Sequence, residues 1–347
     1  MIETKCFAAI SAVEELSNHT IFRREIGKKD ILIEIEFCGV CHTDYHYTKN
    51  DWGITRYPSV PGHEIIGKVK EVGSNIKSIK IGDRVAVGCF VDSCRVCEPC
   101  SNNLEQYCTG GLVKTYNDLY SSEDDHTYGG YSKFIVVDEH FVFLIPKNLD
   151  PAGAAPLLCA GITTFSPLNY WQVGKGKRVG IVGLGGLGHM AVKFSSALGA
   201  KTIVFTTSES KSNDAISFGA DDVVITKNSN SLEKHNGKFD FVLNTVPVPH
   251  NFNTYINLLK VDGTMCIVGS IGPTGELNTR SLIFGRRSIA GSLVGGVEET
   301  QKMLNFCGEN NIVSEIERID INYINKAFKR MIKNDVKYRF VIDMNSL

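Results

Sequence analysis

Apolar and polar positions follow two different rhythms along the chain, and the change comes near Pro151. Before it, short β-branched segments are separated by turns of Gly, Pro and Asp. Such a pattern predicts the strands of a small antiparallel β domain. We expect these strands at residues 31–37, 65–72, 84–87 and 131–137.

After Pro151, apolar segments alternate with stretches of helical periodicity. This alternation predicts a parallel sheet whose strands are joined by crossover helices, so the fold class is expected to be α/β. The expected strands span residues 178–182, 201–205, 222–225, 239–243, 264–268 and 288–290.

The last segment carries a polar amphipathic stretch at residues 322–333, followed by a strand-like run at 338–342. We expect this strand to return and pack on the first domain. The acidic residues at 121–125 are expected to form a solvated loop.

Length and charge restrict the classes of function. A chain of 347 residues favours two domains, each large enough to bury a core. A formal net charge of -1 offers no whole-protein field that would attract nucleic acid or an anionic membrane. No apolar run approaches the roughly 20 residues of a membrane helix, and residues 1–10 lack the pattern of a signal peptide. We therefore expect a cytoplasmic protein with neither a membrane nor a nucleic acid as partner.

The chain has eleven cysteines, and several of them crowd into residues 89–108. Clustered cysteines without a signal peptide favour metal ligation over disulfides. One set has the spacing Cys-x2-Cys-x2-Cys-x7-Cys, which suits a closed, tetrahedral zinc site that braces a loop. Four unrelated buried thiols and an iron–sulfur centre are the alternatives, but no further cysteine group accompanies the set. The four ligands of this predicted site are Cys94, Cys97, Cys100 and Cys108.

A second group of potential ligands lies far apart in sequence: Cys41, His63 with Glu64, and Cys159. Two thiolates and one imidazole neutralise a zinc ion and leave its fourth position for water or a substrate oxygen. Taken alone, each residue has a simpler interpretation. A lone Cys159 is usually a small buried apolar residue, and a lone His63 is usually a turn residue with its hydrogen bonds satisfied.

A glycine motif follows the predicted strand at 178–182 and opens a helical pattern at 187–198. Its glycines permit a tight turn and a close approach to a pyrophosphate, and the helix N-terminus supplies N–H donors. An isolated motif of this kind is more often an ordinary turn, but here a strand precedes it, a helix follows and further strands complete a dinucleotide-binding domain. The motif consists of Gly183, Leu184, Gly185, Gly186, Leu187 and Gly188.

These motifs occur in the order seen in zinc-dependent medium-chain alcohol dehydrogenases, which the chain resembles over nearly its whole length. The runs at residues 38–44, 49–53 and 183–190 resemble the cinnamyl alcohol dehydrogenase-like branch. The resemblance implies a GroES-like β catalytic domain at 1–151, with its zinc lobe at 89–108. It further implies a doubly wound Rossmann domain at 152–290 and a return to the catalytic domain at 291–347.

The resemblance also implies roles for individual residues. Cys41, His63 and Cys159 would be the catalytic zinc ligands, with Glu64 near the metal as a transient ligand. Asp44 would hydrogen-bond the other ring nitrogen of His63 and fix its tautomer. The family's proton relay would be formed by Thr43 and His46, with simple turn residues as the less favoured alternative.

Cofactor contacts are expected at the carboxyl edge of the parallel sheet. Thr163 resembles the family position that contacts the nicotinamide, Thr43 is a further expected cofactor contact, and Thr245 and Gly269 follow later strands. An NAD enzyme usually has an acidic residue about 20 positions beyond the glycine motif, and position 19 beyond Gly188 is Thr207. The surrounding run resembles an NADP-binding segment and predicts NADP(H), with Glu209 as the one nearby acid that could instead serve the ribose. Its predicted cofactor contacts are Thr206, Thr207, Ser208 and Lys211.

We therefore expect a zinc-dependent oxidoreductase with two zinc ions per chain that transfers a hydride between NADP(H) and an alcohol/aldehyde pair. We expect broad specificity for primary alcohols and aldehydes, aromatic ones included. Residues 109–116 lack the tryptophan expected there in plant lignin enzymes, which argues against strict cinnamyl specificity. The alternatives are a polyol or secondary-alcohol dehydrogenase, an inactive descendant, and a zinc-ribbon binding protein. Family analogy predicts a homodimer that associates near residues 281–291.

Overall fold

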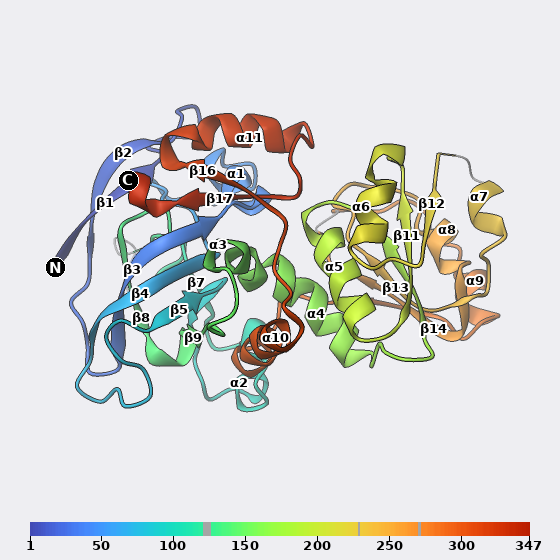
Figure 1. Ribbon diagram of the computed structural model, residues 1–347, viewed down its shortest axis with the longest axis horizontal. Helices are drawn as coiled ribbons and strands as arrows, with labels where there is room; N and C mark the ends of the chain where they lie inside the picture. Colours follow the sequence, from blue (N-terminus) through green and yellow to red (C-terminus); the bar gives the residue numbers. More distant parts are fainter. Residues whose placement is uncertain (121–125, 228–229, 270–271) are drawn as a thin grey trace. The chain divides into compact units, whose positions relative to one another are not determined.

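The computed structural model describes residues 1–120, 126–227, 230–269 and 272–347, so the predicted acidic loop at 121–125 lies outside the described residues. The chain forms two compact units (Figure 1). The first contains residues 1–159 and 295–347, and the second contains residues 160–294.

A mostly antiparallel sheet forms the centre of the first unit. Its strands follow the order β16-β17-β3-β4-β5-β9, and β8 also pairs with β3. The alternation that predicted β3 places Ile31, Ile33 and Ile35 in the core, where each is at most 1% exposed. The strands are β3 (Asp30–Gly39), β4 (Ile65–Val72), β5 (Arg84–Val87), β8 (Phe134–Asp138), β9 (Phe143–Leu144), β16 (Ile316–Asp320) and β17 (Arg339–Asp343).

One strand pair in this sheet is parallel, which the expected antiparallel domain did not include. β16 pairs with β17 in parallel because α11 (Ile324–Ile332) connects them as a crossover helix. β17 then pairs antiparallel with β3, so the end of the chain extends the sheet built from its beginning.

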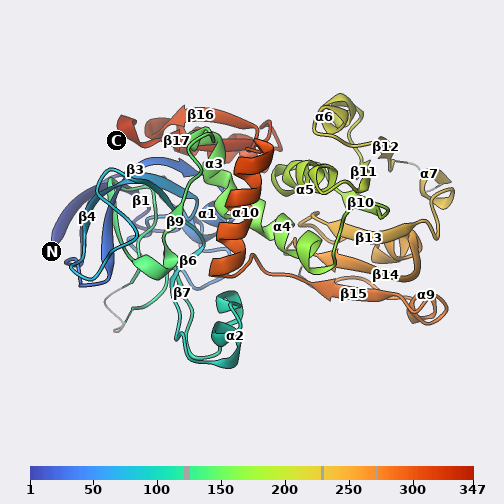
Figure 2. The same cartoon turned by 60° about the horizontal axis from the view of Figure 1, so that its bottom comes forward.

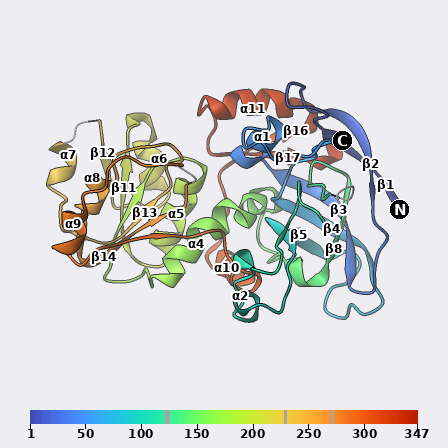
Figure 3. The ribbon, with the colours of Figure 1, turned by 180° about the vertical axis from the view of Figure 1, so that it is seen from behind.

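Smaller elements surround the sheet. Two ribbons are formed by β1 (Ile2–Ala8) with β2 (Ser17–Arg23), and by β6 (Phe90–Asp92) with β7 (Val113–Lys114). In Figure 3 the short helix α2 lies near α10, and the hydrogen bond from Asn103, just after α2, to Glu298 of α10 joins the two parts. The helices are α1 (His42–Thr48), α2 (Glu98–Ser101), α3 (Pro151–Ala154) and α10 (Val297–Asn310), with short 3₁₀ helices at Glu105–Tyr107, Glu139–Phe141, Ala155–Leu158, Ile321–Tyr323 and Met344–Ser346.

The second unit is a parallel sheet in the order β12-β11-β10-β13-β14-β15, which is the strand order of a Rossmann fold. Figure 2 shows its strands side by side, with β15 at one edge. Its strands are β10 (Arg178–Val182), β11 (Lys201–Thr206), β12 (Asp222–Ile225), β13 (Phe239–Asn244), β14 (Leu259–Ile267) and β15 (Ser288–Gly291). Its helices are α4 (Ala160–Tyr170), α5 (Gly186–Ala197), α6 (Ser212–Ser217), α7 (Asn230–Glu233), α8 (Phe252–Ile256) and α9 (Thr279–Ile283), with a 3₁₀ turn at Glu209–Lys211.

Within the described part of the chain, no helix combines the length and the apolar character needed to cross a bilayer.

Candidate functional site

The first unit brings together one residue set from three distant parts of the chain. Cys41 precedes the first turn of α1, His63 and Glu64 precede β4, and Cys159 follows a 3₁₀ turn. Their ligand atoms all lie within 4.8 Å of one another. Tetrahedral zinc with bonds of about 2.0–2.3 Å separates its ligand atoms by roughly 3.3–3.8 Å, so this donor set fits the ion.

Asp44 organises this cluster from behind. Its fully buried carboxylate accepts hydrogen bonds from the N–H of Cys41 at 2.9 Å, the N–H of Gly62 at 3.1 Å and the hydroxyl of Tyr131 at 3.1 Å. The His63 Nδ1 lies 3.2 Å from the same carboxylate, which confirms the expected hydrogen bond. Because Asp44 already accepts the other three bonds, Nδ1 is the donor and Nε2 remains for a metal.

Two glycines are required where the backbone and the cluster approach each other closely. Gly62 has a φ of +104°, and an added Cβ would lie 2.7 Å from the sulfur of Cys38. A Cβ on Gly39 would lie 2.0 Å from Oε2 of Glu64. Larger residues at either position would displace the segment that carries His63 and Glu64.

Glu64 is fully buried and forms an ion pair with the buried guanidinium of Arg339 at the start of β17. Burial raises the pKa of Glu64 to about 7, although Arg339 acts in the opposite direction. Its second oxygen, Oε2, has no hydrogen-bond partner among the described residues. A buried carboxylate oxygen without a partner is costly unless a ligand such as a metal ion satisfies it.

The thiols and the imidazole of the cluster shift one another's pKa values. Cys159 donates a hydrogen bond to Cys41, which lowers the pKa of the Cys41 thiol and raises that of Cys159. Burial lowers the pKa of His63, but Asp44 and nearby thiols raise it well above its usual value. A divalent ion that replaces these protons restores a neutral imidazole and two thiolates.

Thr43 and His46 lie on α1, one helical turn apart, and both are partly exposed. The His46 Nδ1 lies 2.7 Å from a carboxylate oxygen of Asp51. The ring of His46 also lies 5.3 Å from that of Trp52, measured between centroids. His46 therefore has a polar partner toward the solvent, as a residue that passes protons outward requires.

Sequence reasoning missed side chains that distant parts of the chain bring to this cluster. Arg339 pairs with Glu64 across 275 positions of sequence, and Tyr131 donates to Asp44 across 87. The ring of Tyr116 lies 5.8 Å from that of His63. No local spacing signals such contacts, because the fold alone brings these residues together.

The four cysteines of the second set also converge, with all sulfur atoms within 4.8 Å of one another. The sulfurs of Cys97 and Cys108 are 3.9 Å apart, close to the roughly 3.8 Å edge of a tetrahedral zinc–thiolate site. Every ligand is a protein atom, so this site is closed.

Backbone N–H groups prepare part of this lobe for ionisation. Those of Cys100 and Thr109 lower the pKa of the Cys97 thiol to about 5, and those of Val96 and Cys97 lower the pKa of Cys94. Burial raises the pKa of Cys100 to about 12. Four simultaneous thiolates therefore require a cation among them.

In the second unit, the glycine motif forms the turn between β10 and α5. Gly183 has a φ of +91°, and a Cβ on Gly188 would lie 2.1 Å from the carbonyl oxygen of Gly183. A Cβ on Gly185 would have no atom within 4 Å, which leaves space for a close ligand. Gly186 and Leu187 open α5 with N–H groups available to an anion. These features fit a dinucleotide pyrophosphate.

The end of β11 presents hydroxyls and a cation. Thr206 is buried and its hydroxyl accepts the N–H of Ser208 at 3.2 Å, whereas Thr207 is exposed. The Lys211 ammonium donates to the carbonyl of Leu184 at 3.0 Å, beside the glycine turn. Glu209, the acidic residue that could instead bind the ribose hydroxyls, forms an ion pair with Lys227 at 3.4 Å.

Three more of the predicted cofactor contacts lie in this unit, whereas Thr43 lies in the first. Thr163 is buried in the first turn of α4. Thr245 follows β13 and donates its hydroxyl to the carbonyl of Val182 at 2.8 Å. Gly269 follows β14, where a Cβ would lie 2.7 Å from the carbonyl oxygen of Val246. Thr245 and Gly269 therefore have packing roles whether or not a cofactor contacts them.

Comparison with known proteins covers both units. Residues 27–147 match the family model of the alcohol dehydrogenase GroES-like domain, and residues 186–309 match that of the zinc-binding dehydrogenases. The chain is 50% identical to aldehyde reductase YahK of Escherichia coli, over 100% of this chain and 99% of the relative.

Two solved structures are similar over nearly their whole length. A cinnamyl alcohol dehydrogenase of Sorghum bicolor is 42% identical, with a TM-score of 0.95 over 99% of this chain and 98% of the other. The dehydrogenase CAD of Helicobacter pylori, solved with NADP(H), is 41% identical, with a TM-score of 0.92 and 99% of both chains covered.

Proposed function

The chain belongs to the zinc-dependent medium-chain alcohol dehydrogenases, in their cinnamyl alcohol dehydrogenase-like branch, and from this premise we propose that it interconverts primary alcohols and aldehydes with NADP(H). Broad specificity, with aromatic aldehydes included, is part of the proposal. The main support for this proposal is that the ligand atoms of four residues lie close enough together to hold one metal ion: Cys41, His63, Glu64 and Cys159.

We assign one zinc ion to this cluster and a second to the four-cysteine lobe. A catalytic zinc would supply Lewis-acid stabilisation of the charge that develops on the substrate oxygen during hydride transfer. Cys41, His63 and Cys159 would hold the ion, and the hydrogen bond from Nδ1 of His63 to Asp44 leaves Nε2 for it. Glu64 is the proposed transient ligand, because its free oxygen lies within the cluster and Arg339 anchors the other.

Thr43 and His46 would carry the proton that accompanies the hydride. Thr43 lies two residues beyond Cys41, and His46 reaches Asp51 at the surface. A hydroxyl and an imidazole on the same helical turn can pass a proton between substrate oxygen and solvent. We also propose Thr43 as a cofactor contact.

In the second unit, the backbone from Gly183 to Gly188 would hold the pyrophosphate. Thr206, Thr207, Ser208 and Lys211 would bind the 2′-phosphate of NADP(H), because hydroxyls and an ammonium suit a dianion. Thr163, Thr245 and Gly269 would line the nicotinamide half of the cofactor.

Two further properties are proposed. A homodimer would form through β15, the edge strand of the parallel sheet. A cytoplasmic location is favoured because eleven cysteines, six of them assigned to zinc, are best preserved in a reducing compartment.

The proposed activity is tested by kcat/KM for a series of primary alcohols and aldehydes of graded size, together with zinc analysis. Purified protein should contain two zinc ions per chain and should reduce both aliphatic and aromatic aldehydes with NADPH. Cys159→Ser should lose turnover but keep the lobe zinc. Cys6→Ala removes a buried thiol outside both clusters and should retain both ions and activity. Full turnover in Cys159→Ser would contradict the assignment.

A further inference from the structure

Helix α10 begins directly after the chain leaves the second unit at Val294. The first N–H groups of any helix lack partners within the helix, and an N-cap side chain usually accepts one of them. Here the N-cap is Gly296, which has no side chain. The acceptor for this helix end must come from elsewhere in the chain.

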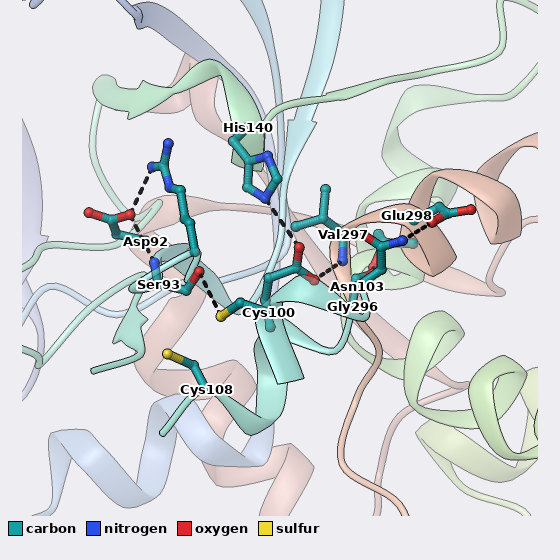
Figure 4. A network of polar contacts seen from close by, with 12 residues as sticks. Asp92, Ser93, Cys100, Asn103, Cys108, His140, Gly296, Val297 and Glu298 are labelled. Carbon is teal, nitrogen blue, oxygen red and sulfur yellow. Dashed lines mark hydrogen bonds and ion pairs between the residues drawn. The ribbon is translucent and has the colours of Figure 1, made fainter. Parts of the chain in front are cut away.

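Glu105 supplies it from within the four-cysteine lobe. Its Oε2 accepts the N–H of Val297, the first residue of α10, at 3.0 Å (Figure 4). Its other oxygen lies 3.2 Å from Nε2 of His140. The Glu105 side chain is buried, and a carboxylate at a helix N-terminus also interacts favourably with the helix dipole.

The close contact requires a residue without a side chain at position 296, whereas the backbone angles there do not. The φ of Gly296 is -71°, which any residue adopts. A Cβ there would lie 2.0 Å from the carbonyl oxygen of Asn103 and 2.9 Å from Oε2 of Glu105. Asn103 also donates its side-chain amide to Glu298 in the first turn of α10. The lobe and the helix end therefore meet without intervening space.

The part of the lobe that makes these contacts lies between its third and fourth ligands, Cys100 and Cys108. The regular structure there is only the end of α2 and one 3₁₀ turn, Glu105–Tyr107. Elements this short are marginal without tertiary constraints. A metal bound to Cys100 and Cys108 would hold both ends of the segment and so fix Asn103 and Glu105.

We propose that Glu105 is a positioning residue that couples the lobe metal to the N-terminus of α10, so that zinc in the lobe orders the segment by which the chain returns from the second unit. This inference rests on the proposed lobe zinc and adds a function to it. The closed site acts on a helix end nearly two hundred positions away in sequence.

Hydrogen exchange of the full-length, zinc-loaded protein tests the coupling in peptides that cover residues 295–300. In Glu105→Ala the N–H of Val297 loses its acceptor, and the first turn of α10 should exchange about five- to thirtyfold faster. Glu105→Gln should stay within about twofold of the unmodified protein, because its amide oxygen can still accept. Glu98→Ala removes an exposed carboxylate from the same lobe and should change nothing.

The role of the metal is tested separately with Cys108→Ser and zinc analysis. Loss of the lobe zinc should accelerate exchange in the first turn of α10 as Glu105→Ala does, while the later turns stay protected.

The coupling can also be tested in the other direction, since linkage is reciprocal. Release of the lobe zinc by Glu105→Ala, but not by Glu105→Gln, would support it. Unchanged exchange at residues 297–300 in Glu105→Ala overturns the proposal. If Cys108→Ser fails to fold, the result for Glu105→Ala decides the test. Slow exchange at residues 297–300 in Cys108→Ser that has lost the lobe zinc also overturns the proposal, whereas the proposed activity fails only if the unmodified, zinc-loaded protein shows no turnover.

Discussion

At the scale of single residues, Asp44 shows how one buried carboxylate can set the geometry of a metal site. It connects α1, the Gly62 turn and Tyr131 to the ring of His63. Asp44→Asn should lower kcat/KM by about 10- to 100-fold, because the amide cannot fix the tautomer of His63 as the carboxylate does. Steady-state kinetics with zinc analysis measures the effect, and the exposed Asp320→Asn serves as control. Activity within twofold of the unmodified enzyme, with both zinc ions present, would argue against this role.

Cofactor choice also depends on single side chains. Lys211→Ala should lower kcat/KM for NADPH by about 10- to 100-fold and leave NADH nearly unaffected, because only NADPH carries the 2′-phosphate that the ammonium would bind. Thr207→Asp should have a similar effect through repulsion of that phosphate. Lys227→Ala should lower kcat/KM for NADPH less than Lys211→Ala does, since Lys227 only neutralises the exposed Glu209. Equal use of NADH and NADPH by the unmodified enzyme would refute the NADP(H) preference.

The sequence predicted the residues of the site better than their surroundings. Both groups of ligands could be proposed because their chemistry is rare and the lobe spacing is local. Arg339 could not be linked to Glu64, since that contact depends on β17 joining the sheet beside β3. The pairing of Glu209 with Lys227 was equally inaccessible, because it requires the register of β11 with β12.

At the scale of elements, strong periodicity was the reliable signal. The strands of the parallel sheet were placed within a few residues, except that β14 begins earlier than expected. Its first half, Leu259–Asp262, has exposed positions at 260–262 and so lacks an apolar run. The ribbon of β1 and β2 was missed because four of the seven β2 residues are exposed polar side chains at its start. Such strands are stabilised by pairing and not by a buried face.

The cysteine lobe provides the test at this scale. It has little regular structure, so its stability should depend on metal binding. Cys100→Ser should lower the melting temperature by roughly 5–15 °C, given that 1 kcal/mol corresponds to about 2–4 °C in domains of this size. Scanning calorimetry with zinc analysis measures this, and Ser101→Ala, an exposed change beside it, is the control. An unchanged melting temperature after loss of the lobe zinc would show that the ion does not brace the fold.

At the scale of the whole molecule, association between chains remains to be tested. β15 pairs only with β14 in the described sheet and so leaves one edge available. Exposed sheet edges are sites of pairing with another chain. Two large apolar side chains lie just before it in sequence, Ile283 and Phe284, which are 75% and 73% exposed. Exposed apolar groups beside an open strand edge favour a two-fold interface of the standard size, about 800 Å² per partner. We therefore expect a dimer at micromolar concentration.

Light scattering coupled to size-exclusion chromatography should give twice the chain mass of 38.2 kDa for the unmodified protein. Phe284→Asp should shift the mass toward the monomer, because a charge buried in an interface without a partner is costly. Ile216→Asp makes the same kind of change on α6, which precedes β12 at the opposite edge of the sheet, and should leave the dimer intact. A monomer mass for the unmodified protein would contradict the predicted dimer. A dimer that survives Phe284→Asp but dissociates in Ile216→Asp would instead place the interface at the β12 edge.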